Sequence, residues 1–467
     1  MILRNLVLSD KNFRQELKNK LVSDRTIKSL TLCNVSHRSS ISLDFLIGNN
    51  DSASVNAEAT ASTATGIEEL IIERCHLDFD GCKAIGQVLS SSSTKLKSFK
   101  MIHVTLLLNN ENDESCITPI IDGINQAGRN GWLESIDFQR IVTTPTPTTT
   151  MMVGSGNAQT QLRRLFTSSF KNCINLRSLR LSDCNIGCRS TTTDDDDDVD
   201  VHELANTIQK LLSQYGKLQS LDLCRNHIDG NGIEILLQSG LSSYHDDHGG
   251  STSSLKRLIL SHNPIGDDGA IHLSRFFSSS SSRNNTSNSS TSTDLMTTRK
   301  TSNTKIESMS LIDCDIWSPG CYILSKELKH FNTLRELIVD GEWEDHLDTI
   351  IESLSSTNVV LQHLSIHSQS HYDDNEEKDD GNSNDYTIID QQWKQIEYYL
   401  ALNRAKLRRL STKQSLSFAL WPTVLENMNN ISSNNNNNGI TTRKKNSNNN
   451  LYADVWYDVI RLSLIHI

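Results

Sequence analysis

The sequence predicts an α/β solenoid, a right-handed horseshoe with a parallel sheet on its concave face and helices on its convex face. Three observations predict it: a short apolar motif recurs along the chain, a loop with Gly or Asp follows each copy, and a helical pattern follows the loop. The motif is clearest in the copies that begin at Leu218 and Leu255, which share their apolar offsets as far as Leu236 and Leu273. Units of this kind stack so that each buries its apolar face against its neighbours.

Each predicted strand carries apolar residues three and five positions after its first Leu-like residue. This alternation is strand periodicity, and the residues in between face the opposite side of the sheet. The shortest spacings between strands are 24 to 29 residues, which fits a leucine-rich period. Strands are predicted to begin at Leu3, Ile27, Ile67, Leu96, Leu133, Leu176, Leu218, Leu255, Ile306, Leu334 and Leu361, with a degraded copy at Leu407.

Residues 1–410 are therefore expected to form one solenoid of about 11 repeats. The longer spacings contain insertions that are rich in Ser, Thr, Asn, Asp or Gly. Because such segments cannot bury enough apolar surface to offset the entropy of ordering, we expect them to be disordered loops on the edges of the solenoid. The predicted insertions lie near 48–66, 142–160, 189–200, 242–253, 278–304 and 368–386.

The C-terminal region, 411–461, is expected to cap the solenoid with helices and to contain an Asn-rich linker at 429–450. Pro422 suits the first turn of a helix, where its missing N–H costs nothing. A terminal repeat needs such a cover because its apolar face has no neighbour. Residues 462–467 read like translated adapter DNA and are expected to be a non-native tail.

The motif L-x-x-L-x-L-x-x-N/C-x-L, with Cys and Asn sharing one slot, resembles the ribonuclease-inhibitor-like leucine-rich repeat family. The slot holds Cys75, Cys184, Asn226, Asn263 and Cys314. It changes to Val104, Ile141, Glu342 and Gln369 in four other repeats, where the backbone amides of the turn must be satisfied in another way. The 403–427 region is similar to a tail of such proteins in microbial eukaryotes. The resemblance implies a horseshoe that binds other proteins.

Composition and charge limit the classes of binding partner and the cellular compartments that are expected. The formal net charge is −11, much of it in acidic runs, and without a cluster of Lys and Arg the chain is not expected to bind nucleic acid. No apolar stretch approaches the ~20 residues of a membrane helix, and Met1–Lys20 lacks the apolar core of a signal peptide. The ten cysteines include no C-x-x-C pair, so reduced structural thiols are expected. A cytoplasmic monomer is the expectation, with a nuclear location left open.

No motif specifies chemistry. Gly154-Ser-Gly156 lacks the strand, the Lys-Ser/Thr and the helix of a phosphate loop, and the histidines lack metal-ligand spacing. The chain is therefore predicted to be no enzyme and to need no metal and no cofactor.

Candidate binding residues are the polar side chains that project from the predicted concave face. An ordinary solvated sheet face is one interpretation. A binding strip with Arg140, Arg180, Asp222 and Arg225 as a central charged ladder is the other, since Arg is favoured at interface hot spots. The candidates are Arg74, Lys100, Asp137, Arg140, Arg180, Asp222, Arg225 and His262.

The leading hypothesis is a non-enzymatic scaffold that binds an unknown protein partner on its concave face. A first alternative is a GTPase-activating protein that resembles the Ran activator, in which Arg189 would act from a strand-to-helix loop. A second alternative is the substrate receptor of a ubiquitin ligase, although no F-box-like helix precedes the repeats.

Overall fold

A computed structural model describes most of the repeat region. The described residues are 1–4, 26–34, 67–91, 95–108, 117–145, 164–187, 199–241, 254–279, 305–367 and 383–406, with isolated positions between 16 and 24 and at 162.

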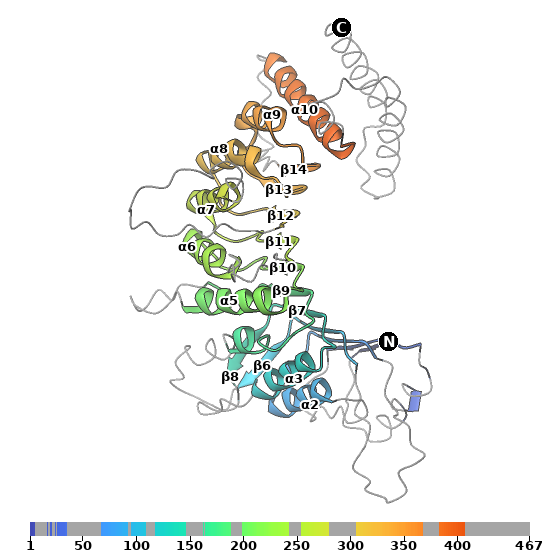
Figure 1. The fold of residues 1–467 in the computed structure, drawn as a ribbon. Helices are drawn as coiled ribbons and strands as arrows, with labels where there is room; N and C mark the ends of the chain where they lie inside the picture. The colour runs from blue at the N-terminus through green and yellow to red at the C-terminus, as the bar shows by residue number, and fades with distance from the viewer. Residues whose placement is uncertain are drawn as a thin grey trace, which may run out of the picture.

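The predicted parallel sheet is present and runs through the described residues as one eleven-stranded sheet. The described pairings between its strands are all parallel, and the strands follow one another in sequence order. They form one side of a curved column, and the helices cover the other side (Figure 1). The strands are β1 (Ile2–Arg4), β2 (Ser29–Cys33), β3 (Glu69–Glu73), β5 (Ser98–Ile102), β7 (Ser135–Gln139), β9 (Ser178–Ser182), β10 (Ser220–Asp222), β11 (Arg257–Ile259), β12 (Ser308–Leu311), β13 (Glu336–Asp340) and β14 (His363–His367).

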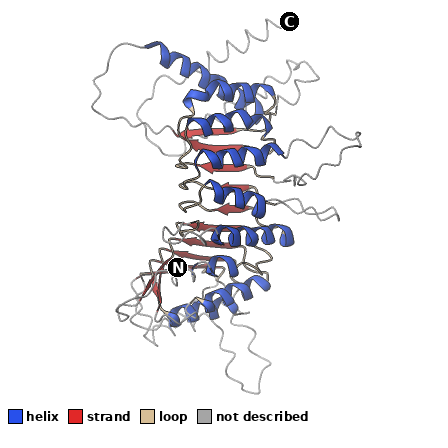
Figure 2. Ribbon diagram, turned by 90° about the vertical axis from the view of Figure 1, so that its left-hand side faces the viewer, coloured by secondary structure: helices blue, strands red, loops and turns tan. Residues whose placement is uncertain are grey.

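The helices pack side by side on one face of the sheet, which is the face turned to the viewer in Figure 2. Most helices follow a strand of their own repeat, so strand and helix alternate as predicted. Short π-helical segments continue α5 and α6, and a short 3-10 segment continues α8. The helices are α2 (Phe79–Ser90), α3 (Thr118–Arg129), α5 (Val199–Lys210), α6 (Gly230–Ile235), α7 (Gly266–Ser279), α8 (Ser318–Glu327), α9 (Leu347–Ser356) and α10 (Ser383–Arg404), with η2 (Leu211–Tyr215), η3 (Leu236–Leu241), η5 (Leu328–His330) and η6 (Glu344–His346).

The core lies between the sheet and the helices, and the predicted offsets fill it. Leu221 aligns with Leu179 on one side and Leu258 on the other, and all three side chains are fully buried. The bulkier Phe99 takes the same place nearer the N-terminus, and its ring meets that of Phe138, at the next buried position of β7, edge to face at 5.9 Å. Burying one such side chain stabilises the fold by roughly 1.5–3 kcal/mol, so the ladder of apolar residues holds the repeats in register.

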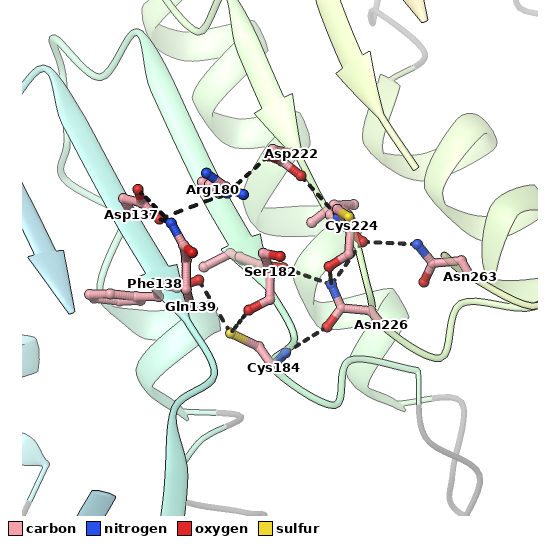
Figure 3. Close-up of polar contacts among 12 residues, drawn as sticks. Asp137, Phe138, Gln139, Arg180, Ser182, Cys184, Asp222, Cys224, Asn226 and Asn263 are labelled. Atoms are coloured by element: carbon pink, nitrogen blue, oxygen red, sulfur yellow. Dashed lines mark hydrogen bonds and ion pairs between the residues drawn. The ribbon is translucent and has the colours of Figure 1, made fainter. Parts of the chain in front are cut away.

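The Asn/Cys slot joins neighbouring repeats beneath the end of each strand (Figure 3). The amide nitrogen of Asn226 donates to the carbonyl of Leu181 in the preceding repeat at 2.7 Å and to that of Leu223 at 2.8 Å. Its amide oxygen accepts from the backbone N–H of Cys184 at 3.0 Å and of Ile186 at 3.3 Å. A buried amide with this many partners is the reason Asn suits the slot, because each partner would otherwise lie unsatisfied away from water.

A cysteine in the slot makes part of the same set of contacts. The Cys184 thiol donates to the carbonyl of Phe138 in the preceding repeat at 3.5 Å and to that of Ser182 at 3.3 Å. Cys314 does the same with the carbonyls of Leu260 and Ile312. The thiol has no second acceptor atom like the amide oxygen of Asn. The backbone N–H groups in the turn of the preceding repeat must therefore bind other acceptors.

A second sheet, which the sequence did not predict, joins three of the repeats whose slot lacks Asn. It has three parallel strands, β4 (His76–Leu77), β6 (Thr105–Leu108) and β8 (Val142–Pro145). The N–H of Thr105 donates to the carbonyl of Cys75 at 2.9 Å, and that of Val142 donates to the carbonyl of Val104 at 3.0 Å. Backbone pairing therefore satisfies the turns that carry Val104 and Ile141 in the slot.

Several predicted boundaries are wrong. Leu3 is not the first residue of a repeat motif, because β1 aligns it with Leu32, five positions into the next copy. The insertion at 142–160 begins too early, since 142–145 form β8. The insertions at 189–200 and 368–386 end too late, since α5 begins at Val199 and α10 at Ser383. Residues 278–279 belong to α7 rather than to an insertion.

The remaining predicted segments lie outside the described residues. They are 48–66, 146–160, 189–198, 242–253, 280–304, 368–382, the copy at Leu407 and everything assigned to 411–461 and 462–467.

The helix α10 covers α9 at the last described repeat. The carboxamide of Asn403 is buried and donates to the backbone carbonyls of Asn358 at 3.2 Å and Leu361 at 2.8 Å. Ile396 and Leu400 on the same helix are buried in the continuous core. This helix therefore closes the apolar face of the described solenoid.

The described cysteines are free thiols, and most are buried. Burial raises the pKa of Cys173, Cys184 and Cys321 to about 12 in each case, because the thiolate would lose its water. These contacts and pKa values fit the expected role of small buried side chains.

We expect stability to fall as the pH rises from about 9 to 12. An unfolded thiol loses its proton near pH 8.5–9, whereas the folded thiol keeps it until about pH 12, so alkali favours the unfolded chain. Each such thiol should account for about 1.4 kcal/mol of lost stability at pH 10. Urea unfolding at pH 7 and pH 10 measures the loss. The Cys184→Ala variant should show a smaller difference between the two pH values, and an unchanged difference would contradict the assignment.

Candidate functional site

Two rows of polar side chains run across the middle of the concave face. The inner row alternates base and acid on four neighbouring strands, namely Lys100, Asp137, Arg180 and Asp222, and Glu69 lies two positions earlier on the adjoining β3. Lys100 Nζ lies 2.8 Å from the Glu69 carboxylate, and Arg180 Nε lies 3.0 Å from Asp222 and 4.0 Å from Asp137. Figure 3 shows Arg180 between its two acids.

The inner row is largely neutralised and half-buried. The side chains of Asp137 and Asp222 are only 16% and 12% exposed, while that of Arg180 is 40% exposed. Burial raises the pKa of Asp137, and a hydrogen bond from Gln139 Nε2 and the charge of Arg180 oppose that shift. Because Arg180 compensates two buried carboxylates, it stabilises the sheet in addition to facing solvent.

This geometry corrects the predicted ladder. Arg140 and Arg225 do not continue the row of Arg180 and Asp222, but lie three positions further along their strands, at the strand ends. Arg140 Nε lies 3.8 Å from the exposed carboxylate of Asp183, and within the described residues Arg225 forms no ion pair. Replacement of Arg180 is expected to lower the stability of the fold, since Asp137 and Asp222 would lose their counter-charge.

The outer row is set by a repeated left-handed turn. One to three positions after each strand of this sheet from β2 to β13, a residue has a positive φ, for example 53° at Arg74, 50° at Arg140 and 57° at Arg225. Its N–H donates to the next repeat, as in Arg140 to Ser182 and Arg225 to Ser261, both at 2.9 Å. A non-glycine residue in this region costs about 1–2 kcal/mol. The ladder of hydrogen bonds holds that conformation and places one side chain per repeat along the edge.

A hollow of about 330 Å³ opens between the two rows. Its walls are polar and come from five consecutive repeats, so a partner there would touch side chains far apart in the sequence. Exposed Arg140, Arg225 and His103 lie at its rim, with the Arg180 guanidinium on the inner side. The lining residues are His103, Gln139, Arg140, Arg180, Ser182, Asp183, Cys224, Arg225 and His262.

The structure brings together half of the predicted site residues. Arg140, Arg180, Arg225 and His262 line the hollow. Asp137 and Asp222 lie beside it as the partners of Arg180, while Arg74 and Lys100 pair with Glu73 and Glu69 outside it. His262 Nδ1 lies 3.0 Å from the Asp313 carboxylate, which holds its ring at the edge of the hollow.

A third row, at the start of the strands, was missed although the sequence contains its signal. The residue after the first Leu-like position alternates in charge, and the pairs form across neighbouring repeats. Glu68 accepts from Lys97 at 2.7 Å and lies 2.9 Å from Lys28, and these two contacts lower the pKa of Glu68 to about 2. Glu307 lies 3.7 Å from both Lys256 and Arg335 in the same way. Exposed ion pairs add little stability. Alternating charge still disfavours incorrect stacking of the repeats, because a misaligned repeat would place like charges next to each other.

Nothing in the described part of the chain forms a group of three His, Cys, Asp or Glu side chains placed to hold a metal ion. Arg189 of the GTPase-activating alternative lies outside the described residues. Among the residues described, there is no helix with the length and apolarity needed to cross a membrane.

Comparison with known proteins agrees with this repeat architecture. A family model described as "Leucine Rich repeat" matches residues 172–187, around β9, and residues 252–274, around β11 and the start of α7. The fold is that of a leucine-rich repeat solenoid. The finer resemblance to the ribonuclease-inhibitor-like subtype stays a prediction.

One solved structure to which the chain is similar is an internalin (inlF) from Listeria monocytogenes. It shares 10% identity, covers 77% of this chain and 96% of that one, and has a TM-score of 0.23. No curated protein matches the chain.

Proposed function

We propose that the protein is a non-enzymatic interaction scaffold whose partner protein docks on the concave face, over the hollow between the two rows. The observation that carries the proposal is Arg225, an exposed cation at the rim that no described acid neutralises. Arg is enriched at interface hot spots because its planar fork binds several acceptors at once.

The arrangement of the rows supports the same surface. The inner row is occupied by its own pairs, so it offers a rigid floor of fixed charge. The outer row offers Arg140 and Arg225, whose guanidinium groups can reorient toward a partner at little cost because Arg140 holds only a loose, exposed pair with Asp183. Because the paired inner row is already ordered, a partner that binds there would lose less conformational entropy.

We expect the double variant Arg140→Asn/Arg225→Asn to lose partner binding while keeping its fold. Asn tolerates the left-handed backbone of both positions, so the turn should survive. Loss of one Arg hot spot costs about 2 kcal/mol, roughly a thirtyfold loss of affinity. Proteins captured from a lysate by the wild type but not by the variant identify the partner, and titration of that purified partner gives the two affinities.

Arg74→Asn is the matched control, since Arg74 has the same backbone conformation and the same row but lies outside the hollow. It should bind the partner as tightly as the wild type. If the double variant bound the partner as tightly as the wild type, with an unchanged circular dichroism spectrum, the partner would not dock at the hollow. Neither the GTPase-activating nor the ubiquitin-ligase alternative gains support from a described residue.

A further inference from the structure

Trp317 occupies a position that other repeats give to a helix-capping aspartate. In α2 and α6 the N-cap residues are Asp78 and Asp229, whose carboxylates accept from the N–H of Gly81 at 2.9 Å and of Gly232 at 2.8 Å. Trp317 has the same extended backbone before α8, with φ −91° and ψ −178°, but its side chain makes no capping hydrogen bond. An aromatic residue is a poor choice for this position on grounds of helix stability.

Neighbouring repeats supply the missing cap. Asp267 Oδ1 accepts from the N–H of Trp317 at 2.9 Å and of Gly320 at 3.1 Å, and Glu342 Oε2 accepts from the N–H of Ser318 at 3.2 Å. The start of α8 is therefore satisfied without the indole. The backbone of residue 317 takes part in the capping of α8, whereas its side chain does not.

The indole is also not needed for packing. Trp317 is 62% exposed, the most exposed of the large apolar side chains that the structure describes. Trp343, in the next repeat, is fully buried, and its Nε1 donates to the carbonyl of Asp340 at 3.1 Å. An exposed Trp brings a large rigid apolar surface into contact with water, which is the property of an interface anchor.

The surroundings of Trp317 are acidic. Asp315, two residues before it, is exposed, as are Glu342, which contacts the first turn of α8, and Glu344 and Asp345 in the adjoining η6. The described basic side chains of α8 and η6 are Lys326 and His346, and both are already engaged. Lys326 Nζ lies 5.8 Å from the centre of the Tyr322 ring, and His346 Nε2 lies 2.9 Å from Ser318 Oγ.

We propose that Trp317 anchors a basic segment of a partner protein, with a Lys or Arg side chain stacked on the indole and the surrounding carboxylates as its counter-charge. A cation over the face of Trp gains about 0.5–2 kcal/mol, more than over any other side chain. The acidic rim selects a basic partner and raises its rate of encounter, in keeping with the net charge of −11. This surface is separate from the concave hollow and does not depend on it.

The test uses the full chain and a fluorescein-labelled peptide of alternating Gly and Arg, with a Gly-Glu peptide of equal length as the negative probe. Anisotropy at low salt gives the affinity for the wild type, Trp317→Ser and Trp317→Phe. Ser is itself a good N-cap residue, so Trp317→Ser should melt at no lower temperature than the wild type. We expect it to bind the Arg peptide about 3- to 30-fold more weakly, with Trp317→Phe in between.

Two controls separate an anchored complex from general attraction to an acidic protein. Ile388→Ser removes another exposed apolar side chain, 53% exposed on α10, and should leave the affinity unchanged. In the spectrum of ¹⁵N-labelled protein, the indole signal that Trp317→Ser deletes should shift on addition of the Arg peptide. Equal affinity of Trp317→Ser and the wild type, an unmoved indole signal, or equal binding of the Gly-Glu peptide would overturn the proposal.

Discussion

Replacing Asn226 by Ala is expected to lower the free energy of unfolding by about 3–5 kcal/mol. The substitution removes the only described acceptor of the Cys184 N–H and the Ile186 N–H and the amide that bonds the Leu181 carbonyl. Three buried backbone groups then lie without a partner, and each costs about 1–3 kcal/mol. The carbonyl of Leu223 is spared, because Asn263 also donates to it at 2.9 Å.

The chain provides its own matched control, because cysteine fills the same slot in other repeats. Asn226→Cys should restore a thiol bond to the preceding repeat, as Cys184 and Cys314 make, but not the two acceptor contacts. Urea unfolding followed by circular dichroism should therefore rank the wild type first, Asn226→Cys second and Asn226→Ala last. Equal stability of the two variants would show that the amide contributes volume rather than hydrogen bonds. If Asn226→Ala lowered the free energy of unfolding by less than about 1 kcal/mol, the hydrogen bonds of the slot would not be important for stability.

The second large effect is expected at Gly86 in α2. A Cβ atom there would lie 2.1 Å from the carbonyl oxygen of Pro119 and 2.5 Å from its carbon, so the α3 backbone would have to move. Gly123 of α3 meets Gly86 from the other side, with its Cβ position 2.6 Å from the Gly86 oxygen. Ala is the better helix former by about 1 kcal/mol, yet Gly86→Ala should destabilise the protein by about 3 kcal/mol, because overpacking against backbone outweighs propensity.

Gly232→Ala is the control for that experiment. It also lies in a helix, α6, but its nearest contact would be the Ile228 methyl at 3.0 Å, which can shift. Its stability should change by less than about 1 kcal/mol, as measured by thermal unfolding of both variants. If Gly86→Ala matched Gly232→Ala, the close approach of α2 and α3 would not exist in solution.

The sequence alone predicted the repeat, the sheet and the sides that its residues face. Strand alternation is local, so the pair of apolar offsets identified residues such as Leu221 and Leu223 as buried and Asp222 between them as turned to the concave side. The Asn/Cys slot was equally visible, because its residue type recurs at a constant offset. Repetition made these assignments reliable where a single strand would have been ambiguous.

The sequence also contains two further signals of these contacts. The alternating charge at the start of the strands, from Lys28 through Glu68 to Lys97, is apparent once the repeats are aligned. So is the exchange of Asp for Trp at the N-cap, where Trp317 stands in the place of Asp78 and Asp229. Both are visible only when one offset is compared across all repeats, rather than along one repeat.

Only the tertiary structure decided which of these polar residues are free. Arg180 and Arg225 look alike in sequence, but Arg180 lies between two half-buried acids from strands some 40 residues away on either side, whereas Arg225 does not. The second sheet likewise depends on three successive turns lying level with one another. Insertions of unequal length separate the repeats, so sequence distance does not give spatial distance. Stacking brings each repeat against its neighbours, and that contact determines which charges are neutralised, which turns pair and which side chains remain open to a partner.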